Sequence, residues 1–107
     1  MIASPTPNNP WESGTFSYTA NRFTSYADLA ANSTDTWFID HGQYTANAYE
    51  TLSSDTVNAY FPNDHTHTSS EGAEVVAKAF VRGMVCGTSP LNQYVVNETS
   101  SIDGSCI

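Results

Sequence analysis

The sequence predicts an α/β fold built on a parallel sheet, and it predicts that this chain carries only part of that sheet. The expected elements run in the order loop, helix, strand, helix, turn, helix, which is half of an α/β alternation. The strand expected at 36–39 is apolar without alternation, which is typical of a strand covered on both faces, and its companion is the stub Ile2-Ala3. Because strands satisfy their backbone groups by pairing with other strands, we expect residues 1–107 to form one partial domain with an incomplete sheet.

The first half of the chain is expected to form a loop, a helix and the strand. Segment 1–21 is expected to be a loop, because it contains residues that interrupt helices and strands: Pro5, Pro7, Pro10 and Gly14. A helix is then expected over 22–31, with an apolar stripe at helical spacing made of Phe23, Tyr26, Ala27 and Ala30. The polar run 32–35 ends that helix, and Trp37 in the following strand is expected in the core.

The second half is expected to be mainly helical. After residues 40–42 close the strand, a helix is expected over 43–52, a short turn of helix over 56–60, and a turn at 61–64. The clearest element is a helix over 70–85, preceded by a capping box in which Thr68 and Glu71 satisfy opposing amides. Glu74 and Lys78 add an ion pair one turn apart. The remaining residues, 91–107, are expected to form a tail.

The charge of the chain excludes some partners. The formal net charge is -8, with only three Lys and Arg residues, which are Arg22, Lys78 and Arg82. Binding to nucleic acid or to an acidic membrane surface requires clustered cations, so neither partner is expected. No apolar run approaches the roughly 20 residues of a membrane span.

Several features are typical of secreted proteins. The sequence is rich in Ser, Thr and Asn, and Asn32 and Asn97 begin sequons that accept N-glycans in the right compartment. A disulfide bond between Cys86 and Cys106 would stabilise the folded chain by about 3 kcal/mol, because it closes a loop in the unfolded chain as well. The alternative is two unpaired buried thiols. No signal peptide is recognisable at Met1, so we expect either that the protein stays inside or that the N-terminal part of a longer protein is missing.

The residues most suited to chemistry lie in the turn before the last helix. In a turn, the Asp64 carboxylate can accept a hydrogen bond from the Nδ1–H group of His67. Nε2 is then free to take up a proton, as in the acid and base of a hydrolytic triad. One alternative is a turn-forming Asp64 beside solvated histidines. Another is a metal site formed by His65 and His67 with Asp64 or His41 as the third ligand, although the turn-favouring neighbours argue against it and we expect no metal.

The same stretch resembles a known family. Residues 61–68 read Phe-Pro-Asn-Asp-His-Thr-His-Thr, and residues 71–77 read Glu-Gly-Ala-Glu-Val-Val-Ala. This looks like the last conserved block of the SGNH, or GDSL-type, hydrolases, and within them it is most similar to the fungal members that deacetylate rhamnogalacturonan. Residues 6–12, 40–41 and 49–52 and the spacing of the two cysteines also match, so the similarity covers nearly the whole chain.

The resemblance implies both a fold and an activity. The fold is a three-layer α/β/α, flavodoxin-like arrangement of which this chain is the C-terminal part. The activity is that of an extracellular carbohydrate esterase that removes acetyl groups from pectic rhamnogalacturonan by a Ser-His-Asp mechanism without a cofactor. Asp64 would be the orienting acid and His67 the general base, while His65 inherits no catalytic role.

The sequence also departs from the family pattern. The Gly-Asp-Ser block with the nucleophile, and the blocks whose Gly and Asn complete the oxyanion hole, do not occur in it. The alternative function is therefore a catalytically inactive fragment, or a remnant that binds polysaccharide.

Further expectations concern substrate contacts, the partner and the behaviour of the isolated chain. Trp11, in its polar loop, is expected to contact sugar, whereas His41 is expected to be structural or solvated more than a substrate contact. The resemblance implies acetylated pectic polysaccharide as the partner, and a complete protein is expected to be a monomer. The isolated chain is expected to expose apolar faces and to aggregate.

Overall fold

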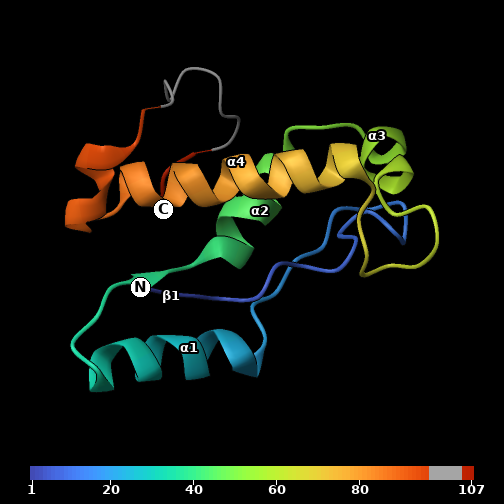
Figure 1. Ribbon diagram of the computed structural model, residues 1–107. Helices are drawn as coiled ribbons and strands as arrows, with labels where there is room; N and C mark the ends of the chain where they lie inside the picture. The colour runs from blue at the N-terminus through green and yellow to red at the C-terminus, as the bar shows by residue number, and fades with distance from the viewer. Residues whose placement is uncertain (97–104) are drawn as a thin grey trace.

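The computed structural model describes residues 1–96 and 105–107. Its elements, in chain order, are β1 (Ile2–Ala3), α1 (Arg22–Ser33), β2 (Phe38–Ile39), α2 (His41–Glu50), α3 (Ser54–Ala59), α4 (Ser70–Cys86) and the 3-10 helix η1 (Pro90–Tyr94). The two strands pair in parallel, with Ile2 opposite Phe38 and Ala3 opposite Ile39. Helix α1 lies on one side of the strands, and α2 and α4 lie on the other (Figure 1). The predicted partial α/β architecture with a small parallel sheet is therefore present.

Helix α1 packs on the sheet through small residues, and only part of the predicted apolar stripe is covered, since Ala27 and Ala30 are half-buried. Ala31 is its buried residue, whereas Phe23 and Tyr26 are 54% and 57% exposed. The two-residue strands offer a narrow surface, and alanine side chains allow the helix backbone to approach it closely. The helix also extends beyond the predicted end at residue 31, because the Ser33 and Thr34 hydroxyls donate to the carbonyl of Ala30 and satisfy its last turn.

The strand β2 is shorter than predicted, and Trp37 does not lie in the core. Its side chain is 44% exposed, whereas Ile39 is buried against Tyr44 of α2 and Ala79 of α4. The helices cover the end of the strand at Ile39, and Trp37 is not part of the cluster that they form. The expectation that Trp37 is a core residue is therefore wrong.

Helix α2 begins at His41, two residues before the predicted start, because Asp40 is its N-cap. The Asp40 carboxylate accepts from the backbone N–H of Gln43, at 3.2 Å. It also accepts a 2.7 Å hydrogen bond from the buried hydroxyl of Ser4, which in turn accepts from the backbone N–H of Gly42. The residue after β1 is thereby joined to the first turn of α2.

Helix α4 forms as predicted, with a different cap. The N-cap is Ser69, whose hydroxyl accepts from Gly72 N–H at 3.3 Å, so the capping box assigned to Thr68 is wrong by one residue. With Ser69 as the cap, Glu71 falls one position too early to bond back to it, and its carboxylate accepts from the Ser70 hydroxyl. The predicted ion pair between Glu74 and Lys78 is present, at 2.9 Å.

The core has two parts, and a disulfide follows α4. Ile39, Tyr44 and Ala79 form one cluster, where α2 and α4 meet the sheet. The second cluster lies at the other end of α2 and contains Tyr49, Val57 and Phe61, with Trp11 and Phe16 packed against it. Cys86 and Cys106 form the predicted disulfide, which excludes the alternative of two free thiols.

Candidate active site

The predicted catalytic turn lies between two fixed points. At one end, Phe61 is buried in the second core cluster. At the other end, the backbone N–H of Ser69 donates to the carbonyl of Tyr60 at 2.7 Å and closes the segment into a loop. The side chains at 62–67 between these points are exposed to solvent. The loop therefore has a fixed base and an exposed tip, which is a common arrangement for binding and catalytic residues.

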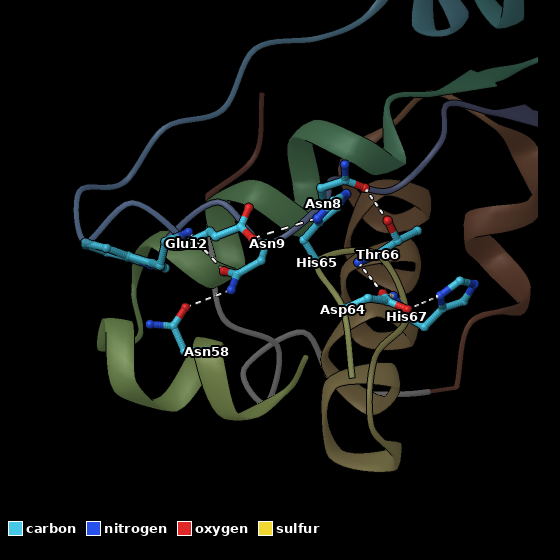
Figure 2. A network of polar contacts seen from close by, with 9 residues as sticks. Asn8, Asn9, Glu12, Asn58, Asp64, His65, Thr66 and His67 are labelled. Carbon is cyan, nitrogen blue, oxygen red and sulfur yellow. Dashed lines mark hydrogen bonds and ion pairs between the residues drawn. The ribbon is translucent and has the colours of Figure 1, made fainter. Parts of the chain in front are cut away.

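The Asp64 carboxylate organises this exposed tip (Figure 2). Its Oδ1 accepts from the backbone N–H groups of Thr66 and His67, each at 2.7 Å. Its Oδ2 lies 2.8 Å from the Nδ1 atom of His67. The contact expected between this acid and this imidazole is therefore present, and the backbone bonds that hold the carboxylate in place come from the same turn.

These hydrogen bonds favour the ionised form of Asp64 and one tautomer of His67. They hold the pKa of Asp64 well below its ordinary value of 3.8, chiefly through the His67 backbone N–H, then the His67 ring and the Thr66 N–H. An ionised carboxylate only accepts hydrogen bonds, so Nδ1 of His67 must carry the proton. In the neutral ring, Nε2 is then the acceptor, and no other group in the described part of the chain bonds to it. The His67 side chain is 82% exposed, so Nε2 is accessible from outside.

The N-terminal loop contacts this turn at three points, which the sequence analysis did not identify (Figure 2). The backbone N–H of Asn9 donates to the carbonyl of His65 at 2.8 Å, and the Thr66 hydroxyl donates to Asn8 Oδ1 at 3.2 Å. Glu12 lies 3.8 Å from Nδ1 of His65. The adjacent amides Asn8-Asn9 in a proline-rich loop were the available signal, since amide side chains commonly bond to neighbouring backbone in such loops.

A polar groove of about 230 Å³ borders the same loop. Its walls are segments 5–9 and 17–21, and none of the residues lining it is charged: Pro5, Thr6, Pro7, Asn8, Asn9, Ser17, Tyr18, Thr19 and Asn21. Tyr18 keeps its phenol proton, because burial and the nearby Asp40 carboxylate raise its pKa. The groove thus offers neutral donors and acceptors, and through Asn8 it adjoins the loop of His67.

The other two histidines form no hydrogen bond with Asp64 or His67 in the part of the chain that the structure describes. The ring of His41 donates from Nε2 to the carbonyl of Val76 at 2.8 Å and packs edge-on against Phe80, so His41 fastens α2 to α4. His65 is turned toward Glu12. Over residues 1–96 and 105–107, no three His, Cys, Asp or Glu side chains gather as metal ligands would, and the alternative of a metal site gains no support there.

The remaining predicted site residues are placed as follows. Trp11 donates from its indole N–H to the carbonyl of Tyr49 at 3.0 Å and packs edge-on against Phe16, with part of the residue still accessible. Asn32 is exposed near the end of α1, where its side chain donates to Asp28. Asn97 lies outside the described residues. No helix in the described ranges is long and apolar enough to cross a membrane.

Comparison with known proteins finds sequence similarity to an esterase. No family model matches it. It is similar to the rhamnogalacturonan acetylesterase of Emericella nidulans, with 53% identity over all 107 residues. The chain spans 43% of the length of that protein. The resemblance inferred from residues 61–77 is therefore confirmed by a match that covers the whole chain.

Proposed function

We propose that this chain is the C-terminal part of an SGNH-type acetylesterase with an α/β/α fold, and that it supplies the acid and the base of a Ser-His-Asp mechanism. The observation that carries the proposal is the 2.8 Å contact between Asp64 Oδ2 and His67 Nδ1, with Nε2 accessible. The 53% identity with a rhamnogalacturonan acetylesterase supports the reaction that we propose for this pair, the hydrolysis of acetyl esters on a pectic rhamnogalacturonan.

The proposed chemistry follows from the tautomer of His67. Nε2 removes the proton of a serine hydroxyl while the serine oxygen bonds to the acetyl carbonyl carbon, and Asp64 stabilises the imidazolium that forms. The imidazolium then protonates the sugar oxygen that leaves as the ester bond breaks. Water, deprotonated by the same Nε2, attacks the acetyl-serine, and acetate is released as the serine recovers its proton.

The nucleophile in this scheme is contributed by polypeptide outside these 107 residues. No serine of the chain follows a Gly-Asp pair, and no serine hydroxyl of residues 1–96 and 105–107 is bonded to His67. The oxyanion donors are assigned to the same missing portion. Residues 1–107 are then one partial domain, completed by the strands and blocks that they lack.

We further propose that the polysaccharide lies across the N-terminal loop. The uncharged groove beside Asn8 suits sugar hydroxyls, which both donate and accept hydrogen bonds. Trp11 is the proposed stacking contact, through the part of the residue that remains accessible. The proposed enzyme acts outside the cell as a monomer, without cofactor or metal, and Asn32 and Asn97 are its proposed glycosylation sites.

A chimera tests the catalytic assignment. We would replace the matching 43% of the Emericella nidulans enzyme with this chain and measure acetate release from acetylated rhamnogalacturonan. His67→Ala is expected to lower kcat by about 10³-fold or more, and Asp64→Asn by about as much, because the base is lost or its tautomer is wrong. His65→Ala is the matched control, since His65 neighbours the pair without bonding to it. Full activity in His67→Ala would refute the assignment.

The second candidate is a non-catalytic polysaccharide-binding remnant, favoured by the absence of a Gly-Asp-Ser block. The purified chain alone distinguishes the two candidates when it is assayed with p-nitrophenyl acetate and in binding to acetylated polysaccharide. Binding without turnover by the chain, together with an inactive chimera, would favour the remnant. Turnover by the chain that is abolished in His67→Ala would instead reveal a nucleophile within these residues.

A further inference from the structure

We propose that Asn8 and Asn9 are positioning residues that hold the Asp64–His67 pair in its hydrogen-bonded arrangement from the neighbouring loop. This inference rests on the function proposed for that pair. Within the described residues, no hydrogen bond joins either asparagine to Asp64 or His67. The asparagines act through His65 and Thr66, which lie between that acid and that base in the chain (Figure 2).

The first reason is that the catalytic loop has few other supports. Among the described residues, Asp64 bonds only within its own turn, to Thr66 and His67. The polar contacts that tie the tip of this turn, within the described residues, to the rest of the chain come from segment 8–12. The conformation of the tip therefore depends on that segment.

The second reason is that Asn9 is itself tied to the core. Its Oδ1 accepts from the backbone N–H of Trp11 at 3.0 Å, and its Nδ2 donates to Asn58 Oδ1 at 2.7 Å. The Trp11 indole donates to the carbonyl of Tyr49, which is fully buried. A continuous path of hydrogen bonds thus runs from the buried helix α2 through the N-terminal loop to His65.

The third reason is the chemistry of the amide. Asn9 uses both its donor and its acceptor, so neither Asp nor Leu replaces it. Asparagine also carries no charge that would compete with Asp64 for His67. By contrast, the pair of Glu12 and His65 is 3.8 Å apart and its side chains are 65% and 53% exposed, so it contributes little to holding the loop.

Nuclear magnetic resonance of the full chain tests this proposal without requiring turnover. The readouts are the imidazole nitrogen shifts of His67, which report the Nδ1-protonated tautomer, and the titration of the Asp64 carboxyl. Asn8→Ala and Asn9→Ala are expected to reduce the fraction of that tautomer and to move the pKa of Asp64 up toward its ordinary value. Glu12→Gln is the matched control in the same loop, and it is expected to leave both readouts unchanged.

A double-mutant cycle assigns the effect to one bond. Thr66→Val removes the hydroxyl that donates to Asn8 and keeps the backbone N–H that donates to Asp64. The double variant Asn8→Ala/Thr66→Val is expected to change the His67 tautomer fraction and the pKa of Asp64 by as much as either single variant does. The cycle does not involve Asn9, so it still tests the positioning role if Asn9→Ala fails to fold. An unchanged His67 spectrum in Asn8→Ala, with the resonances of Val57 intact, would overturn the proposal.

The chimera separates this proposal from the proposed function. There, Asn8→Ala and Asn9→Ala are expected to lower kcat by about 10- to 100-fold, as for a misplaced base. Because both asparagines also line the groove proposed for the sugar, kcat is measured with p-nitrophenyl acetate, so that lost contacts to the polysaccharide do not enter the result. If His67→Ala is inactive and the asparagine variants keep full kcat, the positioning role is wrong and the function stands. If His67→Ala retains activity, the function is wrong, whatever the asparagine variants do.

Discussion

At the scale of single residues, one carboxylate accounts for much of the geometry of the site. Asp64 accepts three hydrogen bonds, two from backbone and one from the ring of His67, while it remains open to solvent. Two of these bonds come from the backbone, so the acid would keep its place even if the ring were removed. The imidazole, in contrast, is oriented by Asp64 alone within the described ranges of the chain.

The lowered pKa of Asp64 predicts a dependence of stability on pH. The unfolded chain takes up the proton near the ordinary value of 3.8, while the folded chain, whose pKa is lower, stays ionised. The contribution of Asp64 is therefore complete above that value and is lost as the pH falls through it toward the folded pKa. Urea unfolding at about pH 6 and about pH 3 should show a smaller pH effect in Asp64→Asn than in the unaltered chain. Asp35→Asn, at an exposed turn, is the control; an equal change in both variants would contradict the prediction.

At the scale of elements, the packing of α4 on α2 and the sheet depends on one glycine. A Cβ atom at Gly83 would lie 2.8 Å from Cγ2 of Ile39 and 2.9 Å from Cδ2 of Tyr44. These contacts are too short to be accommodated without movement of the helix or of both side chains. The two groups also belong to the first core cluster, so the helix cannot shift locally without disturbing that cluster.

Gly83→Ala is therefore expected to destabilise the chain. Alanine favours a helix over glycine by up to about 1 kcal/mol, but overpacking a core costs about 1–3 kcal/mol. The free energy of unfolding, measured in urea, should fall by about 1 kcal/mol. Ala77→Gly, at an exposed position of the same helix, measures the difference in helix propensity between alanine and glycine without the packing cost. A Gly83→Ala variant as stable as the unaltered chain would mean that the helices are not so closely packed.

Local patterns predicted some elements well and missed others for definite reasons. Helix α4 has a long apolar period and was placed almost to the residue, but three consecutive hydroxyl residues, 68–70, are equivalent as caps in the sequence. The start of α2 was missed because Asp40 was interpreted as the end of a strand and not as a helix cap. Trp37 was wrongly assigned to the core, because the hydrophobicity of a strand residue does not show whether a neighbouring helix extends far enough to cover it.

The site shows the same division between local and distant contacts. The bond from Asp64 to His67 spans three residues, and turn chemistry was enough to predict it. The bond from Thr66 to Asn8 spans 58 residues, and its formation depends on how the N-terminal loop packs on Tyr49. No pattern within one segment contains that information.

At the scale of the whole molecule, apolar surface is left uncovered on the far side of the sheet. Phe23, Tyr26 and Leu29 recur at steps of three along α1 and are 54%, 57% and 64% exposed. Phe23 and Tyr26 pack edge-on with ring centres 6.0 Å apart, and Leu29 follows about one turn further along the helix. Exposed apolar side chains arranged in this way promote association, in agreement with the expectation of exposed apolar faces.

Leu29→Gln is expected to reduce self-association of the isolated chain while leaving its melting temperature nearly unchanged. The side chain is largely exposed, so little buried area is lost on substitution. Sedimentation velocity over a range of concentrations measures the effect. Leu52→Gln is the contrasting variant, because Leu52 packs on the second core cluster and its substitution should lower the melting temperature. A monomeric unaltered chain at every concentration would contradict the prediction.

The hydroxyl of Ser4 has a consequence for how well the fold tolerates loss of the first strand. It joins the residue after β1 to Asp40 and Gly42, some 36 positions later, inside the first turn of α2. Deletion of residues 1–4 would therefore remove one strand of the described sheet and also leave the amide of Gly42 without its acceptor. The loss would disturb the first turn of the helix that carries Tyr49, and through Trp11 the loop that holds Asp64 and His67.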